Sequence, residues 1–380
     1  MTAVGEFGVY VHVPFCRSRC DYCAFATYDD RHHLTDAYVE ACLSEMTAAA
    51  GEGMPPATSV FFGGGTPSLL PVELLAALVG AVERAPGAEV TVECNPEDVT
   101  AARVAAYVDA GVTRISVGVQ STDPAVLAGL GRRHTPGAVD QALDVLGTSG
   151  LTSWNVDLIF GGPGEQPGEG PGEQPGGGPG EGGSWDSVLA SIVSRDRPPP
   201  HVSAYALTVE PGTPLAADPR RHPDPDVLAA RYEATERILT AAGYRWEEIS
   251  NWARPGHGCR HNRLYWRQGD YRGFGSAAHS HLGGRRWWNV RTPDRYIRSM
   301  AAGQSPVGGE EVLDEEQRRF EQWALALRTP AGIPQEVLPP APELEGLVEW
   351  RGGLAVLTVA GRLVADDITC RIRAEAAPGS

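Results

Sequence analysis

The feature that most constrains the fold of this chain is an alternation of short apolar runs with amphipathic segments from residue 9 to about residue 210. The apolar runs predict six strands, over residues 9–13, 60–62, 90–93, 114–119, 155–159 and 203–207. Helices are expected between them, with Thr35 and Thr100 as N-caps and Gly111 at the end of the second of these helices. Alternating strands and helices predict a parallel sheet, either open or curled into a barrel.

Residues suited to chemistry follow several of these predicted strands. In parallel α/β folds the site lies at the carboxyl ends of the strands, where successive loops meet. The segments that fall there are the cysteine-bearing loop after residue 13, the glycine loop at 63–67, Glu93, Gln120 and Asp157. Their common position predicts one shared site.

The cysteine-bearing loop contains Cys16-x3-Cys20-x2-Cys23. Three thiolates in eight residues suit three irons of a cubane iron–sulfur cluster, and the fourth iron then stays open to a small molecule. A zinc site is the alternative, but zinc usually takes four ligands in two paired units, and the sequence has no second pair. The spacing therefore predicts a [4Fe–4S] cluster.

Composition excludes several other classes of protein. The net charge of −16 argues against a nucleic-acid-binding surface, and no run of 18 apolar residues is present to span a membrane. Seven cysteines, three of them clustered, fit a reducing cytosol and a cluster better than a disulfide framework. One of the others is expected in the core, on the apolar face of the helix after Thr35, formed by Tyr38, Val39, Cys42 and Met46.

Pattern changes along the chain divide it into three parts. Residues 1–225 form the expected core domain, and within it residues 164–183, rich in Gly, Pro and Glu, are expected to be a flexible surface insertion that buries nothing. Residues 226–308 are expected to complete the barrel, with a helix over 231–242 and a strand over 244–249. Residues 309–380 are expected to form a small domain, with a helix over 313–327 and a β-like tail over 355–372.

Individual residues at the predicted site suggest roles by their chemistry. Glycines at 63–65 permit close backbone approach to a ligand, and Glu93 is suited to accept hydrogen bonds from ribose hydroxyls. Arg132 can pair with a carboxylate, although Arg133 is equally suited on charge alone. Asp157, an acid inside an apolar strand, needs polar partners, which favours a role in the site.

Taken together, many segments resemble one branch of the radical S-adenosylmethionine (SAM) superfamily, which contains oxygen-independent coproporphyrinogen III dehydrogenases and the HemW heme chaperones. The matching segments are YVHVPFCRSRCDYCAF, FFGGGTPS, VECNPE, SVGVQS, GRRHT, NVDLIFG, SAYALTVEPGTPL, YRWEEISNWARPGHGCRHNRLYW and GFGSAAHS. They cover most of residues 9–215 and extend to about 297, and their order makes the resemblance specific.

The resemblance implies a fold and a set of ligands. The fold is a partial (βα)6 TIM-like barrel with a small α+β C-terminal domain, and SAM binds the open iron through its amino and carboxylate groups. The family register favours Arg132 over Arg133. The residues implied in cofactor binding, besides the three cysteines as cluster ligands, are Tyr10, Tyr22, Gly64, Gly65, Thr66, Glu93, Gln120, Arg132, Asp157 and His261.

Two departures separate the branches of this family. The dehydrogenases carry a fourth cysteine two positions after the third, where this chain has Phe25, and they have a longer N-terminal arm than the eight residues that precede Val9 here. Both departures favour the heme chaperones. Dehydrogenase activity, by oxidative decarboxylation of propionates in porphyrin biosynthesis, is the main alternative, and a heme-degrading radical SAM methyltransferase is a third reading.

A third discriminator is His261-Asn262-Arg263-Leu264-Tyr265-Trp266, which resembles the HNxxYW motif of the chaperone branch. A neutral imidazole is a suitable axial ligand for heme iron, and aromatic side chains pack on a porphyrin face. The resemblance therefore implies heme binding at His261, with Cys259 and His257 as nearby alternatives. Taken without the family, a histidine among aromatics is more often a hydrogen-bonded core residue.

The resemblance also implies partners. The partners are heme and heme-acceptor proteins, with respiratory-chain components among the candidates. The resemblance also implies that the protein is cytoplasmic, either free or peripheral at the membrane. It leaves open whether the chain is a homodimer, whether SAM is cleaved, and whether the protein is an enzyme at all; a chaperone without coproporphyrinogen oxidase activity is the favoured expectation.

Overall fold

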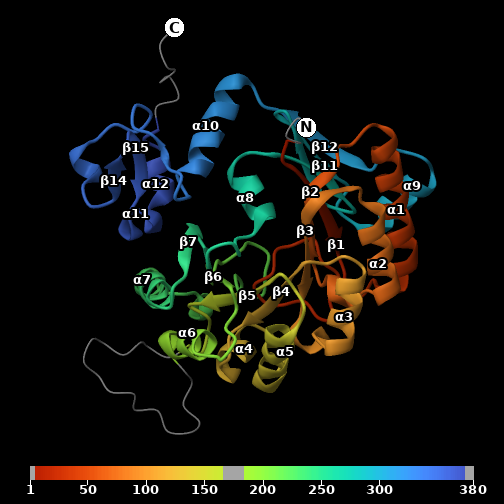
Figure 1. The fold of residues 1–380 in the computed structure, drawn as a ribbon, viewed down its shortest axis with the longest axis horizontal. Helices are drawn as coiled ribbons and strands as arrows, with labels where there is room; N and C mark the ends of the chain where they lie inside the picture. Colours follow the sequence, from red (N-terminus) through yellow and green to blue (C-terminus); the bar gives the residue numbers. More distant parts are fainter. Residues whose placement is uncertain (1–4, 166–183, 373–380) are drawn as a thin grey trace.

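The computed structural model describes residues 5–165 and 184–372. A large sheet dominates it, with the order β12-β11-β10-β9-β1-β2-β3-β4-β5-β6-β8-β7 (Figure 1). Its parallel strands are β1 (Phe7–Val13), β2 (Ala57–Gly64), β3 (Arg84–Cys94), β4 (Arg114–Gln120), β5 (Ser153–Phe160), β6 (His201–Ala206) and β9 (Asp270–Phe274). Strands β1 to β6 follow one another in chain order, without the reversal of a doubly wound sheet. The sheet is a partial barrel, which confirms the expected fold class.

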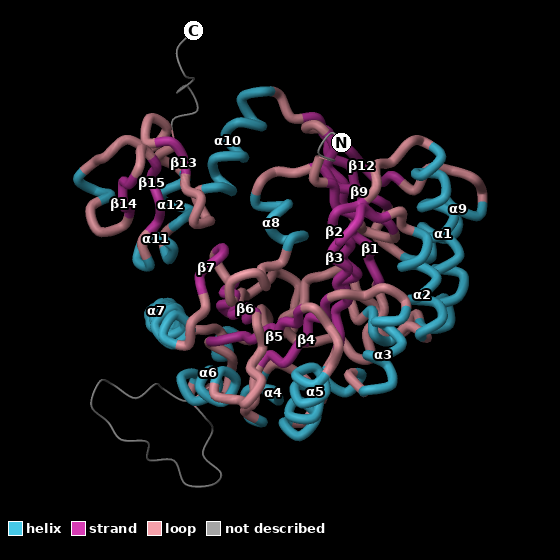
Figure 2. The backbone as a smooth tube through the Cα atoms, in the orientation of Figure 1, coloured by secondary structure: helices cyan, strands magenta, loops and turns pink. Residues whose placement is uncertain are grey.

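Helices cover the outer face of the parallel strands, as Figures 1 and 2 show. They are α1 (Thr35–Gly51), α2 (Val72–Ala81), α3 (Ala101–Asp109), α4 (Pro124–Gly129), α5 (Pro136–Thr148), α6 (Trp185–Val193) and α7 (Pro225–Ala241). The core lies between the two layers: alternate residues of β1 (Val9, Val11, Val13) are buried with Val39 and Met46 of α1. The residues between these valines face the barrel interior, where Tyr10 stacks on Phe61.

Antiparallel strands extend both edges of the sheet. On one side lie β8 (Asn251–Ala253) and β7 (Arg245–Glu248), and on the other β10 (His279–Leu282), β11 (Arg285–Asn289) and β12 (Val307–Val312). Two helices accompany these extensions, α8 (Arg260–Trp266) and α9 (Pro293–Ala301). Because β12 pairs with β11 up to Val312, the expected domain boundary at residue 309 falls inside a strand of the large sheet.

The C-terminal residues form a small module with a core of its own. It consists of α10 (Glu315–Ala326), a three-stranded sheet of β13 (Ile333–Pro334), β15 (Leu354–Leu357) and β14 (Val348–Arg351), and helices α11 (Val359–Leu363) and α12 (Ala365–Thr369). Arg362 of α11 joins it to the barrel: the guanidinium lies 2.6 Å from Glu236 of α7 and 3.6 Å from the centre of the Trp246 ring. The predicted β-like tail is wrong beyond Leu357, because residues 359–369 are helical.

Two smaller expectations need correction. Thr100 caps α3 as predicted, but Thr35 does not cap α1, because its hydroxyl donates to the His32 carbonyl (2.8 Å) and Leu34 holds the N-cap position. Most of the predicted insertion at 164–183 lies outside the described residues. Glu165, near its start, is an exception to the expectation that the segment buries nothing, since its carboxylate forms a buried ion pair with Arg231 (2.6 Å).

Among the described residues, none of the helices has both the length and the apolar character that a bilayer span requires.

Candidate functional site

A cavity of about 480 Å³ opens at the carboxyl ends of the parallel strands. Eleven of the thirteen predicted site residues line it: Cys16, Cys20, Tyr22, Cys23, Gly64, Gly65, Thr66, Glu93, Gln120, Arg132 and Asp157. They come from the loop after β1, from the carboxyl-terminal halves of β2 to β5 or directly after them, and, for Arg132, from the connection between α4 and α5. The structure thus brings together most of the residues that the sequence places at one edge of the sheet.

The cysteine loop is held by backbone hydrogen bonds and by two ion pairs, of which one joins Asp21 to Arg221 (2.7 Å). The Cys16 amide donates to the Tyr28 carbonyl (3.0 Å) and the Tyr28 amide to the Pro14 carbonyl (2.8 Å), which closes the loop at its base. Arg17 pairs with Asp98 (2.9 Å), at the turn after β3. The loop is therefore fixed to β1 and β3, and its cysteines face the cavity.

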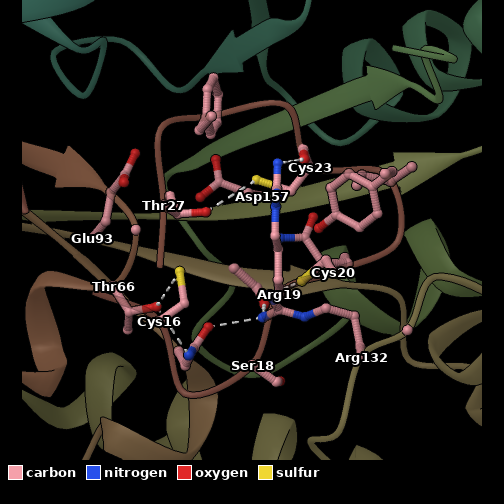
Figure 3. A pocket seen from close by; sticks show the side chains of 18 of the residues that line it. Cys16, Ser18, Arg19, Cys20, Cys23, Thr27, Thr66, Glu93, Arg132 and Asp157 are labelled. Carbon is pink, nitrogen blue, oxygen red and sulfur yellow. Dashed lines mark hydrogen bonds between the residues drawn. The ribbon is translucent and has the colours of Figure 1, made fainter. Parts of the chain in front are cut away.

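The three sulfur atoms surround one space, with Glu93 on the side of Cys16 and Arg132 on the side of Cys20 (Figure 3). All three are free thiols, and burial raises the pKa of Cys16 to about 11. In the described part of the chain no three His, Cys, Asp or Glu side chains group closely enough to hold a single metal ion. Because each thiolate of a cubane site binds a different iron, the thiols need not converge on one point as zinc ligands do, and their arrangement fits a cluster.

Arg132 lies beside Cys20 and forms hydrogen bonds to several groups around the cavity. One terminal nitrogen lies 3.4 Å from the Cys20 sulfur, and the other donates to the Asn95 side-chain oxygen and to the Gly118 carbonyl, both at 2.9 Å. Asn95 in turn donates to the Thr66 hydroxyl (3.4 Å). Within residues 5–165 and 184–372 Arg132 pairs with no carboxylate of the protein, and its expected pairing with a carboxylate stays a prediction. Sequence reasoning missed Asn95, although its position directly after β3 was a usable signal.

Gln120 ends β4 in the left-handed backbone region, with φ +63°. Its side-chain amide lies over Gly118, where a Cβ would come within 2.9 Å of the Gln120 nitrogen. Glycine at 118 therefore makes room for both the Gln120 amide and the Arg132 guanidinium.

Two carboxyl groups form the inner wall. Glu93 accepts a hydrogen bond from the Gly64 amide (3.1 Å), and Asp157 accepts from the Ser116 hydroxyl and the Asn155 amide, both at 2.8 Å. Burial, and next the nearby charge of Asp157, raise the pKa of Glu93 to about 8, and burial likewise raises the pKa of Asp157. Ionisation of both acids is therefore unfavourable in this cavity, and a ligand with hydroxyl or cationic groups would stabilise the ionised carboxylates.

Changing Glu93 to Gln is expected to flatten the pH dependence of folding stability. The pKa of Glu93 is about 8 in the folded protein against an ordinary 4.5, so the folded state binds a proton that the unfolded chain releases. The stability from this group is fully present below about pH 4.5 and is lost as the pH rises through about 8. Urea unfolding of the cluster-free protein from about pH 5 to 8 measures the difference, with exposed Glu97→Gln, on the same cavity, as the control. Parallel curves for wild type and Glu93→Gln would contradict the prediction.

The two remaining predicted residues, Tyr10 and His261, line a second cavity of about 190 Å³ inside the barrel. It shares Glu93, Asp157 and Tyr205 with the first cavity, so the two adjoin. Two residues that sequence reasoning missed also line it, Arg114 and His201, which are buried and bonded to each other. Arg114 begins the predicted strand over 114–119 and His201 precedes the predicted strand over 203–207, so neither stands at the carboxyl end of a strand, where the site was expected.

His261 is buried in this second cavity with both ring nitrogens engaged. Nδ1 lies 3.0 Å from the Ser59 hydroxyl and Nε2 lies 2.8 Å from the Tyr265 hydroxyl, one turn along α8. The ring stacks on Phe61 at 5.4 Å, and burial lowers the pKa of His261 to about 3. The imidazole is therefore neutral, which suits a metal ligand, but neither nitrogen is free to accept one in this arrangement.

Comparisons with known proteins bear on this site. Residues 10–169 match the family model of the radical SAM superfamily. The chain is 41% identical over 381 residues to the Heme chaperone HemW of Mycobacterium tuberculosis, spanning 95% of this chain and 93% of the relative. It is 37% identical over 316 residues to the Heme chaperone HemW of Escherichia coli, spanning 81% and 76%.

A solved structure supports the fold. The coproporphyrinogen III oxidase HemN of Escherichia coli, described as a radical SAM enzyme, matches with a TM-score of 0.80 over 97% of this chain and 90% of that one. At 20% sequence identity the likeness concerns the fold alone.

Proposed function

Because this chain belongs to the HemW family within the radical SAM superfamily, we propose that it binds heme and transfers it to acceptor proteins. The observation that carries the proposal is the 41% identity to a named heme chaperone along 95% of the chain. Phe25 adds support, since it stands where the dehydrogenase branch has a fourth cysteine, and its side chain lines the main cavity.

The proposal includes a [4Fe–4S] cluster held by Cys16, Cys20 and Cys23. In support, the three free thiols surround one end of the cavity without converging on a single point. The bound cluster would supply an open iron for the amino and carboxylate groups of SAM. The Arg132 guanidinium, 3.4 Å from the Cys20 sulfur, would offset the negative charge of the thiolates.

The remaining space of the cavity suits SAM. A volume of about 480 Å³ lies in the range of small-molecule sites, and the lining combines apolar surface with a few fixed polar groups. Glu93 is assigned to the ribose hydroxyls, and the backbone of Gly64, Gly65 and Thr66 to the amino group. Arg132, Gln120 and Asp157 complete the polar wall, with Tyr22 packed beside Cys20 and Cys23.

Heme ligation by His261 is what the family resemblance implies. It requires the Tyr265 hydroxyl to leave Nε2, because both ring nitrogens are engaged in the described arrangement. The neutral state of the buried imidazole supports ligation, whereas the two hydrogen bonds oppose it. The finer assignments rest on family resemblance: acceptors in the respiratory chain, a cytoplasmic location, and a homodimer.

Two measurements on the anaerobically reconstituted protein test the function. Hemin titration followed by absorption should show saturable binding, and an added apo-cytochrome b should take up the heme. Coproporphyrinogen III supplied with SAM and a reductant should give no protoporphyrinogen at catalytic turnover. Turnover to that product would overturn the chaperone proposal, and so would the absence of saturable heme binding.

A further inference from the structure

The ring nitrogens of the ten histidines differ in their availability to a metal. Within residues 5–165 and 184–372, which include all ten, two have neither ring nitrogen in a hydrogen bond, His33 and His279. The other eight have at least one ring nitrogen engaged: His12, His32, His134, His201, His222, His257, His261 and His281. An exposed imidazole without a protein partner is the group to examine as a heme ligand.

His279 is exposed and has a fixed orientation. It begins β10 and pairs across the strands with Trp288 of β11, and the two rings stack with centroids 5.6 Å apart and an interplanar angle of 27°. The indole is held from the other side by β12, because a Cβ on Gly309 would meet the Trp288 ring. The imidazole is thus oriented by packing, while its nitrogens stay available.

An arginine, Arg291, follows Trp288 by three residues on a segment that runs beside the start of β10. The Ala277 amide donates to the Val290 carbonyl and the Asn289 amide to the Ala278 carbonyl, both at 3.0 Å, so residues 277–279 run alongside residues 288–291. Arg291 is exposed at the end of this segment and pairs with no carboxylate within the described ranges. A free arginine beside an exposed imidazole is suited to a propionate group.

The cysteine loop approaches the same place through His12. The His12 Nε2 lies 3.1 Å from the Ala26 carbonyl, next to Phe25, whose side chain is 67% exposed. The His12 backbone adjoins the β9–β10 connection, since the Tyr38 hydroxyl bonds both the His12 carbonyl and the Ser276 amide (2.8 Å each). Charges on His279 and Arg291 also contribute, after burial, to lowering the pKa of His12 to about 4. These contacts place Ala26, next to Phe25, and the β9–β10 connection on two sides of His12. Phe25, His279, Trp288 and Arg291 are together called the His279 surface.

We infer that heme binds on the His279 surface, with His279 as an axial ligand, Phe25 packed on the porphyrin and Arg291 facing a propionate. The inference rests on the proposed function, and it assigns heme to a site distinct from the one at His261. An exposed ligand suits a protein that must release its cargo to another protein, because the heme stays accessible. Phe25 also lines the main cavity, so the inferred heme would lie beside the proposed SAM site.

Hemin titration of full-length wild type, His279→Ala, His261→Ala and His33→Ala tests the inference. Loss of the ligand should weaken hemin binding by His279→Ala at least tenfold and change the Soret spectrum, and free imidazole should restore the histidine-ligated spectrum. His33→Ala, in the short 3-10 helix His32–Leu34 that precedes α1, should match wild type. Gly309→Val, which displaces the Trp288 ring while keeping His279, should weaken binding to a smaller extent.

The outcomes separate the inference from the proposed function. Wild type that fails to bind hemin overturns the proposed function itself. Wild type that binds hemin, with His279→Ala equal to it in affinity and spectrum, overturns the site alone. A histidine-ligated spectrum that is lost in folded His261→Ala and kept in His279→Ala assigns the ligand to α8 and also overturns the site; urea unfolding of each variant confirms that it is folded.

Discussion

Replacing any one of Cys16, Cys20 or Cys23 by Ala is expected to reduce the iron bound after anaerobic reconstitution from about four atoms per chain to near zero. Each thiolate in the proposed site holds a different iron, so the loss of one leaves a cubane with two protein ligands and two open irons. Iron and sulfide analysis, together with the visible absorption of the cluster, measures the effect.

The matched control is Cys370→Ala, which removes an exposed cysteine far along the chain from the loop. It should keep the full iron content. Retention of a cluster with wild-type iron content in Cys20→Ala would contradict the assignment of Cys20 as a cluster ligand. A stoichiometry of one zinc ion per chain in wild type would favour the metal site that the spacing argues against.

The parallel core was predictable because its signals are local. Runs such as Val9–Val13 and Asn155–Ile159 are too short and too apolar to be surface helices, and their alternation with amphipathic segments admits few topologies. Elements whose identity depends on distant partners were missed. The tail after Leu357 reads as β-like, yet residues 359–369 form helices whose Arg362 is held by Glu236 and Trp246 of the barrel.

The residues of the site likewise divide into those that could be predicted from local sequence and those that could not. Residues near the carboxyl end of a strand, such as Glu93 and Asp157, were predictable because the carboxyl ends of parallel strands meet at one edge. Asn95, directly after β3, could have been found in the same way, but its bond to Arg132, 37 positions away in sequence, could not be predicted. The availability of a histidine also depends on its neighbours: Ser59 and Tyr265 engage His261, whereas the stacked indole of Trp288 leaves the nitrogens of His279 free.

Changing Glu45 to Ala is expected to lower the free energy of unfolding by about 3 kcal/mol. This buried carboxyl of α1 accepts from the Tyr296 hydroxyl (2.6 Å), the Asn289 amide (2.9 Å) and the Gly275 amide (3.1 Å). Alanine leaves the hydroxyl and the Gly275 amide unsatisfied, at about 1–3 kcal/mol each, while Asn289 keeps its second bond to the Gly275 carbonyl. Urea unfolding at neutral pH measures the loss.

The same change also tests the inferred heme site, because Glu45 anchors the β9–β10 connection that leads to His279. Glu45→Gln keeps an acceptor in place and should cost less than Glu45→Ala, and exposed Glu40→Ala on the same helix should cost almost nothing. A loss below about 1 kcal/mol in Glu45→Ala would show that the network does not stabilise the connection. If the network does hold the connection, folded Glu45→Ala should also bind hemin more weakly than Glu40→Ala, since the imidazole and Arg291 would no longer be held in register.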